Sequence, residues 1–344
     1  MELQIEDVAF GGAGVGRLNG KAVFVPFTIE GERVAARITR EKKQFAEARL
    51  EQVIAASPDR TTPECPYFGR CGGCRYQHMS YEHQLAVKQR QVAQILTRIG
   101  KIADPPVRPI IPSPKPYAYR NRVTVHCEDG VIGYYRYDVH KLIDVERCPI
   151  AAPEVNRALS ELRARKPRDG HYTLRARGGP RVFAQTNDEV AEALAQLVDS
   201  FFSPGGALLI DAYCGSGFFT KRLRGKFDRV LGIEWDRFAV AAAEEDAAPN
   251  ESYIAGDVET ELAAHINANA AVIVDPPATG LTSGTRQILL QQTPHTLVYV
   301  SCNPATLARD VRELHVGFAI ESVTPLDMFP QTAETEVAVH LRAR

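Results

Sequence analysis

The order of hydrophobic and polar positions predicts a small β-structure at the start of the chain. Short β-rich runs separated by turn signals predict strands at 3–5, 22–26, 33–38 and 46–53. Turns are predicted at the glycine-rich segment Gly11–Gly16 and at Asn19-Gly20, a pair typical of hairpins because both residues tolerate positive φ. Short strands of this kind are typical of an OB-like barrel, a five-stranded fold that often binds oligonucleotides. We therefore predict a barrel domain over residues 1–57.

A different pattern follows over residues 58–179. Apolar residues at helical spacing predict a helix over Tyr81–Ile99, with Gly100 as its C-cap. After a proline-rich connector, residues 117–178 alternate β-like runs with arginine and aromatic residues, as at Tyr119-Arg120. This mixture is typical of RNA-binding sheets, where bases stack and arginines contact phosphate. An antiparallel sheet with an ordinary solvated face explains the pattern equally well.

From residue 180 to residue 344 the pattern changes again. An amphipathic helix is predicted over 190–201, and strands and helices then alternate. The strands are predicted at 207–211, 229–234, 252–255, 271–275 and 296–300. Such alternation is typical of a doubly wound parallel sheet. The fold class is therefore α/β, with a Rossmann-like C-terminal domain that follows the barrel and a central α+β domain.

Composition narrows the class of protein. The 344 residues are 44% hydrophobic and 24% charged, with a net charge of −1, so any nucleic-acid contact must rest on local basic patches. No apolar run approaches the roughly 20 residues of a membrane span, and the N-terminus lacks a signal-peptide core. We expect a cytoplasmic protein with no membrane association and no obligate protein partner.

Acidic residues end three successive predicted strands of the C-terminal domain. Asp211 precedes Gly215-Ser-Gly217, Glu234 ends the second strand, and Asp257 follows the third. Glycines at a strand-to-helix turn bring the backbone close to a ligand, and an acid ending the second strand can accept both ribose hydroxyls. The missing third glycine disfavours a dinucleotide, so the pattern favours S-adenosylmethionine. A purely structural turn is the alternative.

Two further groups follow the fourth and fifth predicted strands. Asp275 precedes two prolines, which hold an extended backbone at the ligand edge of the sheet. Cys302 follows the apolar run Leu297–Val300 and precedes Asn303-Pro304, a pair suited to begin a helix. A thiolate is favoured beside a helix N-terminus, so Cys302 is a candidate nucleophile. Taken alone, it would more often be a buried packing residue.

The remaining cysteines are clustered in a way that suggests metal binding. Cys65, Cys71 and Cys74 lie within ten residues, with Gly72-Gly73 between the last two, and Cys148 is a fourth candidate downstream. Four thiolates suit either zinc or an iron–sulfur cluster, and the spacing alone does not separate the two. Three unrelated thiols are the alternative.

These motifs resemble those of the RNA uracil-5-methyltransferase family, in its rRNA-type branch with a TRAM barrel and a 4Fe–4S cluster. The resemblance spans nearly the whole chain. It is carried by the block Ser301–Asp310, the four cysteines, the segment Phe183–Asn187 and the segment Met328–Thr332. It implies that residues 1–57 are a TRAM domain, that 58–179 carry the cluster, and that 180–344 are the methyltransferase domain.

The resemblance also implies roles for individual residues. Cys302 is the expected nucleophile, and Glu336, four positions beyond Thr332, is the expected general base. The expected cofactor contacts are Gln185, Tyr213, Glu234, Asp257 and Asp275, with Asp275 also able to bind the pyrimidine edge. The expected ligands of the 4Fe–4S cluster are Cys65, Cys71, Cys74 and Cys148. The substrate implied is RNA, with 23S rRNA favoured and tRNA as the alternative.

Three departures from the family pattern keep alternatives open. Ala278-Thr279 stands where relatives have Arg-Ala, and Phe218 replaces a position that is often polar. Glu334 stands where relatives commonly have His, so a swap of roles with Glu336 stays open. An RNA-binding scaffold without catalysis and a cytosine-5 methyltransferase are the competing interpretations.

Overall fold

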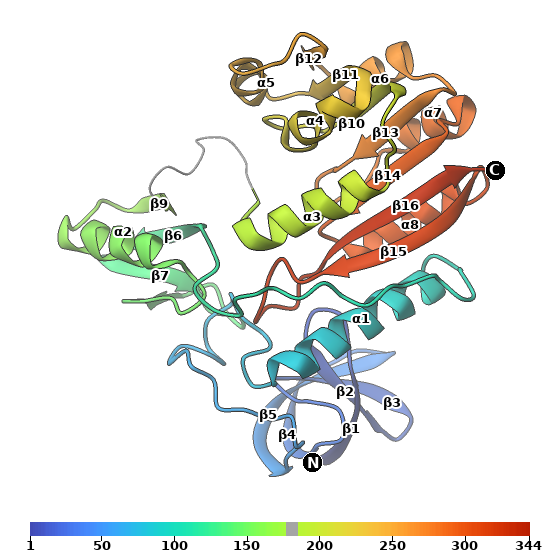
Figure 1. The fold of residues 1–344 in the computed structure, drawn as a ribbon. Coiled ribbons are helices and arrows are strands. Elements are labelled where there is room, and N and C mark those ends of the chain that lie inside the picture. The colour runs from blue at the N-terminus through green and yellow to red at the C-terminus, as the bar shows by residue number, and fades with distance from the viewer. Residues whose placement is uncertain (177–184) are drawn as a thin grey trace. The chain divides into compact units, whose positions relative to one another are not determined.

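The structure is a computed structural model that describes residues 1–176 and 185–344 (Figure 1). Phe183 and Ala184 of the predicted cofactor segment lie outside the described residues. The chain divides into two compact units. Unit 1 comprises Met1–Gln91, Lys115–Gly179 and Phe329–Glu334, and unit 2 comprises Val92–Pro114, Pro180–Met328 and Thr335–Arg344. The predicted domain boundaries stay predictions.

Unit 1 begins with the expected barrel, drawn in blue in Figure 1. Its strands are β1 (Glu2–Val8), β2 (Ala13–Leu18), β3 (Lys21–Pro26), β4 (Arg33–Glu41) and β5 (Phe45–Ala55), closed in the order β1-β2-β3-β5-β4. Alternate residues such as Val23 and Val25 fill the core, as the period of a strand requires. Asn19 and Gly20 have φ values of 50° and 79° and join β2 to β3, so the predicted hairpin is confirmed.

The prediction of a turn over Gly11–Gly16 is wrong for its second half, which forms strand β2. Close packing explains the glycines. A Cβ at Gly14 would lie 2.0 Å from Thr28 Oγ1, and one at Gly16 would lie 2.6 Å from the Gln4 carbonyl oxygen. These glycines therefore let neighbouring segments approach the strand, and they do not mark a turn.

The rest of unit 1 contains a four-stranded antiparallel sheet. Its strands are β6 (Arg122–Glu128), β7 (Val131–Tyr135), β8 (Leu142–Asp144) and β9 (Gly170–Arg175), in the order β8-β7-β6-β9. Val125 of β6 packs with Val155 and Leu159 of helix α2 (Pro153–Ala164). Helix α1 (Tyr81–Arg98) confirms the predicted helix. Its residues up to Gln91 belong to unit 1 and the remainder to unit 2.

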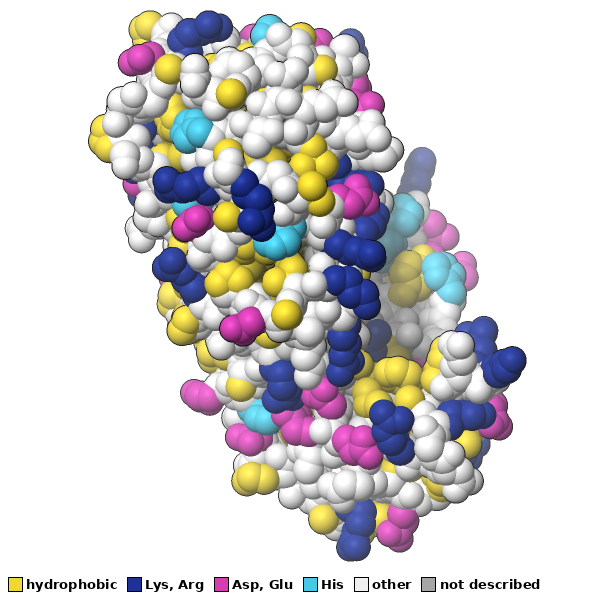
Figure 2. All heavy atoms as spheres, turned by 90° about the vertical axis from the view of Figure 1, so that its right-hand side faces the viewer, with side chains coloured by type: hydrophobic (Ala, Val, Ile, Leu, Met, Phe, Trp, Pro, Cys, Tyr) yellow, Lys and Arg dark blue, Asp and Glu magenta, His cyan; other side chains and the backbone are white. Residues whose placement is uncertain are grey.

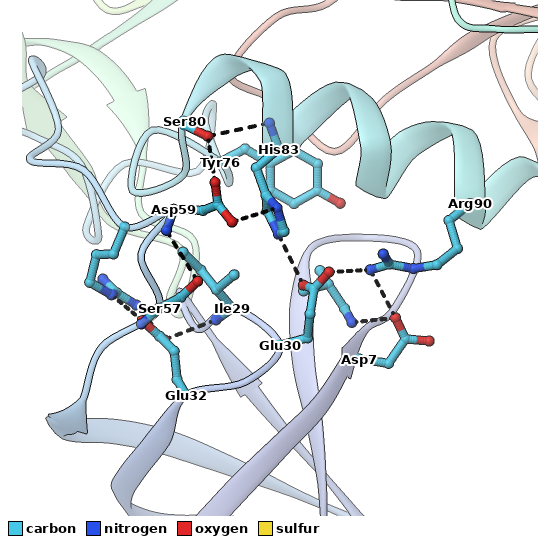
Figure 3. Close-up of polar contacts among 12 residues, drawn as sticks. Asp7, Ile29, Glu30, Glu32, Ser57, Asp59, Tyr76, Ser80, His83 and Arg90 are labelled. Carbon is cyan, nitrogen blue, oxygen red and sulfur yellow. Dashed lines mark hydrogen bonds and ion pairs between the residues drawn. The ribbon is translucent and has the colours of Figure 1, made fainter.

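Polar contacts fix the first half of α1 to the barrel within unit 1 (Figure 3). The two ring nitrogens of His83 lie 3.2 Å from carboxylate oxygens of Asp59 and Glu30. Arg90 reaches Glu30 at 2.6 Å and Asp7 at 3.2 Å. Burial alone would raise the pKa of Glu30, but the hydrogen bond and charge of Arg90 bring it below its usual value. The Glu30 carboxylate is therefore held ionised beside Arg90.

Unit 2 is built on a seven-stranded sheet in the order β12-β11-β10-β13-β14-β16-β15. Its strands are β10 (Gly206–Ala212), β11 (Phe227–Glu234), β12 (Glu251–Ala255), β13 (Ala270–Val274), β14 (Thr296–Ser301), β15 (Phe318–Leu326) and β16 (Glu336–Ala343). The five strands β10 to β14 confirm the predicted parallel sheet. Strands β15 and β16 were not predicted, and they extend the sheet in an antiparallel manner beside β14.

Helices connect the parallel strands of unit 2 (Figure 1). They are α3 (Asp188–Ser200), α4 (Phe218–Leu223), the short 3₁₀ helix η1 (Arg224–Lys226), α5 (Arg237–Glu244), α6 (Val258–His265), α7 (Ser283–Gln292) and α8 (Pro304–Leu314). Strand β14 is buried along its whole length, as is typical of a central strand covered on both faces.

The surface carries local charge and no dominant sign. On the face drawn in Figure 2, lysine and arginine side chains are spread among acidic ones, in agreement with the net charge of −1. Within residues 1–176 and 185–344, no helix combines the length and the hydropathy needed to cross a bilayer.

Candidate active site

Two of the predicted catalytic residues lie at the same end of the unit 2 sheet. Strands β14 and β16 are antiparallel, and their last pair is Ser301 with Val337. Continuing this register by one residue brings Cys302 level with Glu336, the first residue of β16. Cys302 is half-buried, while Glu336 is only 2% exposed. The residues that carry this thiol and this carboxyl are thus level with one another at the carboxyl end of β14, although they are far apart in the sequence.

The local structure around Cys302 is that of a helix start. Helix α8 begins at Pro304, and the Asn303 side chain accepts a hydrogen bond from the Ala305 N–H at 3.0 Å. The hydroxyl of Ser301 accepts one from the Asn303 N–H at 3.1 Å. These contacts fix the turn that carries Cys302. The helix dipole favours the thiolate at this position.

Asp275 lies at the end of β13, beside the same edge. Its N–H donates to the Ala212 carbonyl at 3.3 Å, and β13 pairs with both β10 and β14. The residue is half-buried, and burial raises the pKa of its carboxyl to about 7. Burial and the charge of Asp275 raise the pKa of Asp211 well above its usual value. Ionisation of either Asp211 or Asp275 therefore disfavours ionisation of the other. Both lie where the strand order reverses, between β10 and β13.

The segment 275–280, which we call the proline loop, is tied to the start of α8. The Ala278 carbonyl accepts hydrogen bonds from Asn303 Nδ2 at 3.1 Å and from Thr306 Oγ1 at 3.0 Å. Arg309 Nη2 donates to the Thr279 carbonyl at 3.0 Å. The contacts use backbone oxygens, so the departure at Ala278-Thr279 leaves this tie intact. The polar residues of the block Ser301–Asp310 thus hold the loop of Asp275 against the turn of Cys302.

Asp310 ends that block and has a structural role that was not predicted. Its carboxylate is fully buried and accepts hydrogen bonds from the Leu281 N–H at 2.8 Å and the Tyr299 hydroxyl at 2.7 Å. Arg286 Nη1 and Arg309 Nε donate to it at 3.0 Å and 2.8 Å. A buried carboxylate with four donors is well satisfied. In the sequence, the indication of this role was that Asp310 belongs to the block Ser301–Asp310, which carries the family resemblance.

The predicted cofactor acids line the ends of β10 to β12. Glu234 accepts hydrogen bonds from the N–H groups of Gly215 at 3.1 Å and Asp236 at 3.0 Å, one on each carboxylate oxygen. Each oxygen keeps further lone pairs for a ligand. Asp257 caps α6 by accepting the Thr260 N–H at 2.9 Å. Both acids therefore also hold their own loops in place.

The turn after β10 has a strained backbone and open space beside it. Tyr213, Gly215 and Gly217 have positive φ values of 68°, 54° and 88°. Such a backbone is strained at Tyr213, and strain of this kind gathers at ligand sites. A Cβ at Gly215 would meet nothing within 4 Å, so space is open above this turn. One oxygen of Asp211 is buried there without a hydrogen-bond partner among the described residues.

The segment that holds Gln185 is anchored by its neighbour Asn187. Gln185 is half-buried and directly precedes α3. Asn187 accepts the Val190 N–H at 3.4 Å and donates to Ser113 Oγ at 3.0 Å. It also donates to the Met328 carbonyl at 3.5 Å, at the end of the strand that leads toward the predicted base.

Glu334 and Glu336, the two candidates for the general base, differ in burial. Glu334 is exposed, and its N–H donates to Thr332 Oγ1 at 3.2 Å. Glu336 is buried at the strand end. The two acids therefore lie in different surroundings, and only Glu336 belongs to the strand that pairs with β14.

The four predicted cluster cysteines gather within unit 1. None forms a disulfide. Burial, and to a smaller extent the charge of Cys148, raise the pKa of Cys71 to about 11 and that of Cys74 to about 12. The same charge raises the pKa of Cys65. Across the described residues, no three His, Cys, Asp or Glu side chains meet the geometry of a metal site. The thiols are thus neighbours, but they are not arranged as ligands.

The order of the unit 2 sheet, with acids ending three successive strands, defines a class I S-adenosylmethionine-dependent methyltransferase. Family models match at both ends of the chain. Residues 261–344 match a tRNA (uracil-5-)-methyltransferase model and residues 1–50 match a TRAM domain model.

Relatives cover nearly the whole chain. An uncharacterized RNA methyltransferase of Aquifex aeolicus is 30% identical over 98% of this chain and 97% of its own length. One of Halalkalibacterium halodurans is 31% identical over 98% and 95%. The chain therefore belongs to the RNA uracil-5-methyltransferase family. Among solved structures, this chain is similar to the Pyrococcus abyssi tRNA (uracil-54, C5)-methyltransferase bound to S-adenosyl-L-homocysteine. The TM-score is 0.76 and the sequence identity is 23%, over 99% of this chain and 100% of that one.

Proposed function

We propose that this chain methylates carbon 5 of a specific uridine in RNA through a covalent adduct at Cys302. The observation that carries the proposal is the strand register that sets Cys302 opposite Glu336 at the end of the sheet. Carbon 5 of uracil is a poor nucleophile, so direct methylation is slow. Addition of a thiolate to carbon 6 makes carbon 5 electron-rich and divides one difficult step into two easier ones.

The residues then act in sequence. The Cys302 thiolate forms a bond to carbon 6, and the electron pair of the 5,6 double bond becomes an enolate. S-adenosylmethionine, when bound, supplies the methyl group to carbon 5. Glu336 removes the carbon 5 proton, the double bond re-forms, and the thiolate leaves carbon 6. Asp275 is placed to hydrogen-bond the pyrimidine edge or the cofactor at the same strand edge.

The cofactor contacts proposed are Gln185, Tyr213, Glu234 and Asp257. Their support is the strained turn, the open space at Gly215 and the remaining lone pairs of Glu234. Residues 180–344 would thus perform the chemistry. The barrel at 1–57 and the central domain at 58–179 would hold the RNA on either side of the target, because a uridine must leave its stack to reach the thiol. A cytoplasmic location stays a prediction.

We propose further that Cys65, Cys71, Cys74 and Cys148 hold a 4Fe–4S cluster. The charge of Cys148 raises the pKa of Cys65, Cys71 and Cys74, which indicates that the four thiols lie close together, and the cationic core of a cluster would favour their thiolate forms. Nothing in the methyl-transfer steps needs a redox change, so the cluster would be structural. Iron and acid-labile sulfide analysis of anaerobically purified protein tests this, with Cys127→Ala as a control that keeps the cluster.

The substrate proposed is 23S rRNA, because a TRAM barrel together with four clustered cysteines resembles the rRNA-type branch. A tRNA is the second candidate, favoured by the matched model and by the activity of the Pyrococcus abyssi protein. Labelled methyl transfer to 23S rRNA fragments and to tRNA transcripts, followed by mapping of the modified base, separates them.

An RNA that carries 5-fluorouridine tests the adduct itself, because fluorine at carbon 5 cannot leave as a proton. We expect a denaturation-stable protein–RNA adduct with wild type and with Cys127→Ala, and none with Cys302→Ala. With ordinary RNA, Glu336→Gln is expected to accumulate the methylated adduct, whereas Glu334→Gln should turn over. No adduct with any RNA, in protein shown to bind S-adenosylmethionine, would contradict the proposal and favour the scaffold interpretation.

A further inference from the structure

Unit 1 contains a cavity of about 350 Å³ that no predicted role explains. It lies between the end of β3, strand β5 and the cysteine-bearing loop, and its lining includes Phe27, Phe68, His78 and Tyr137. Arg49 and Arg60 also line it. Its size is at the lower end for ligand sites, which suits a group as small as one nucleoside.

Aromatic rings surround this cavity. The Phe27 ring centroid lies 5.1 Å from that of Phe68 and 5.0 Å from that of Tyr137, both in edge-to-face arrangements. His78 lies 5.6 Å from Phe68 in a tilted stack. The Arg75 guanidinium is 5.2 Å from the Tyr137 centroid. Rings and guanidinium planes of this kind form stacking surfaces for nucleic-acid bases.

The backbone at Phe27 is strained. Its φ is +65°, in the left-handed region that a bulky residue rarely adopts. The conformation is held by Arg60, whose Nη2 donates to the Phe27 carbonyl at 2.8 Å. Arg60 is in turn held by the buried Glu32, with Nε–Oε1 and Nη2–Oε2 distances of 2.5 and 2.8 Å. Strain kept in place by a buried ion pair indicates that the ring position has a function.

His78 gives a second, independent indication of a ligand. The residue is 1% exposed and lines the cavity, yet neither ring nitrogen has a hydrogen bond of acceptable geometry among the described residues. Burial and the charge of Arg60 lower the pKa of His78 to about 3, so its ring is neutral, with one donor and one acceptor. A neutral imidazole in an aromatic cavity can hydrogen-bond the edge of a base.

We propose that this cavity binds one unstacked base of the substrate RNA, away from the uridine that is methylated. The inference rests on the proposed function, since it takes RNA as the ligand. The exposed guanidinium of Arg49 at the rim suits the adjoining phosphate. Phe68 lies between Cys65 and Cys71 and packs with Cys74 and Cys148, so the fold of the cysteine loop sets one wall. One function of the cysteine loop is then to hold Phe68 in place at the side of the cavity.

The test measures binding of a short single-stranded RNA of about eight nucleotides, a usual site size for such barrels, by fluorescence anisotropy of the full chain. Phe27→Gly removes the ring and relieves the positive φ, and this relief offsets part of the packing that is lost against Phe68 and Tyr137. The affinity of this variant for RNA should fall about 5- to 150-fold, the equivalent of 1–3 kcal/mol for one stacked base. Tyr137→Ala should show a loss of the same kind.

The matched control is Phe24→Ala, which removes an aromatic ring from β3, the strand that directly precedes Phe27, but outside the cavity, where Phe24 contacts Phe45. It should bind RNA within twofold of wild type. Crosslinking of an RNA that contains 4-thiouridine should map to Phe27 or Tyr137 in the wild type. Unchanged affinity of both cavity variants would overturn the inference even if methyl transfer is intact. Cavity-dependent binding by a chain that transfers no methyl group would support it while contradicting the proposed function.

Discussion

Asp310 in unit 2 and Glu32 in unit 1 are both fully buried carboxylates bound by arginine, yet they hold different kinds of loop. Asp310 accepts hydrogen bonds from two arginines, a tyrosine hydroxyl and the Leu281 N–H, and thereby fixes the end of the proline loop. Glu32 is held by Arg60 alone and by two backbone N–H groups, as part of Figure 3 shows. Through Arg60 it fixes the strained Phe27.

The two buried carboxylates therefore position different functional groups in the two units. In unit 2 the buried carboxylate positions the loop of Asp275 and the turn of Cys302, which contact the reacting base in the proposed mechanism, so its loss should lower kcat. In unit 1 the buried ion pair positions a stacking ring, so its loss should raise KM for RNA and leave the chemical step unchanged. A buried ion pair is weak evidence of stability in itself, but removal of one partner is costly in either place.

The largest effect is expected for Asp310→Ala. The change leaves Arg286, the Tyr299 hydroxyl and the Leu281 N–H buried without their acceptor, and it should cost about 3–5 kcal/mol of unfolding free energy. Because a displacement of about 1 Å can cost 10²-fold in rate, kcat should fall by about that factor. Urea unfolding and methyl-transfer kinetics at saturating RNA measure the two effects.

The control for this prediction is Glu313→Ala. Glu313 also contacts Arg286, at 2.7 Å, but its side chain is 50% exposed. Exposed pairs contribute little, so the change should cost less than about 1 kcal/mol and leave kcat unaltered. Equal effects of the two substitutions would show that Arg286, and not the buried carboxylate, fixes the proline loop.

The same contrast explains how much the sequence predicted. The turn of Cys302 was predicted because the strand, the helix cap and the helix start that form it follow one another directly in the sequence. Glu336 was assigned by resemblance, since the register that brings it level with Cys302 requires the unpredicted strand β16. The cavity in unit 1 was missed, because Phe27, Phe68 and Tyr137 are far apart in the chain and follow no period. The prediction of a turn at the glycines of β2 was wrong for a related reason. These glycines are required by close packing against residues distant in the sequence, and not by a turn.

The second prediction concerns Arg60→Met, which keeps an unbranched apolar stem but leaves Glu32 buried without its cation. We expect a loss of about 3–5 kcal/mol in the stability of unit 1. RNA affinity should fall with it, since the Phe27 carbonyl loses its donor, whereas kcat at saturating RNA should stay close to wild type. Arg37→Met is the control, because its pair with Glu51 is exposed and should contribute below about 1 kcal/mol. A loss of kcat with unchanged affinity would break the comparison.

The third prediction uses pH, because the carboxyls of the two units shift in opposite directions. In unit 1, burial would raise the pKa of Glu30 and Glu32, but the hydrogen bonds from Arg90 and Arg60 lower both. Their stabilisation is present above the unfolded pKa near 4.5 and is lost as pH falls through the lower folded values. In unit 2, burial raises the pKa of Asp275 to about 7, so its contribution is present below 3.8 and is lost as pH rises toward 7.

Acidification from pH 7 to pH 5 should therefore stabilise unit 2 through Asp275 by on the order of 2 kcal/mol. It should destabilise unit 1, because His78 gains a proton below about 6.5 in the unfolded chain, whereas its buried ring has a pKa of about 3. Amide hydrogen exchange, corrected for its intrinsic pH dependence, can follow β13 and β3 separately. Asp275→Asn should reduce the pH dependence of β13, where the buried Asp211 also has a raised pKa, and leave that of β3. A parallel response of the two strands in wild type would show that the units do not titrate independently.

The smallest effect compares two glycines with similar backbones. Gly280 and Gly31 have φ values of +77° and +84°, so alanine at either position should cost about 1 kcal/mol for the left-handed conformation. A Cβ at Gly31 meets nothing within 4 Å, whereas one at Gly280 would lie 2.5 Å from Asp310 Oδ2. Gly280→Ala should therefore cost about 1 kcal/mol more, because the buried carboxylate must shift, and it should lower kcat where Gly31→Ala does not. Thermal unfolding and single-turnover methyl transfer measure the pair. If both variants keep the wild-type rate, the proline loop tolerates movement of Asp310, and the proposed link between that carboxylate and the chemistry fails.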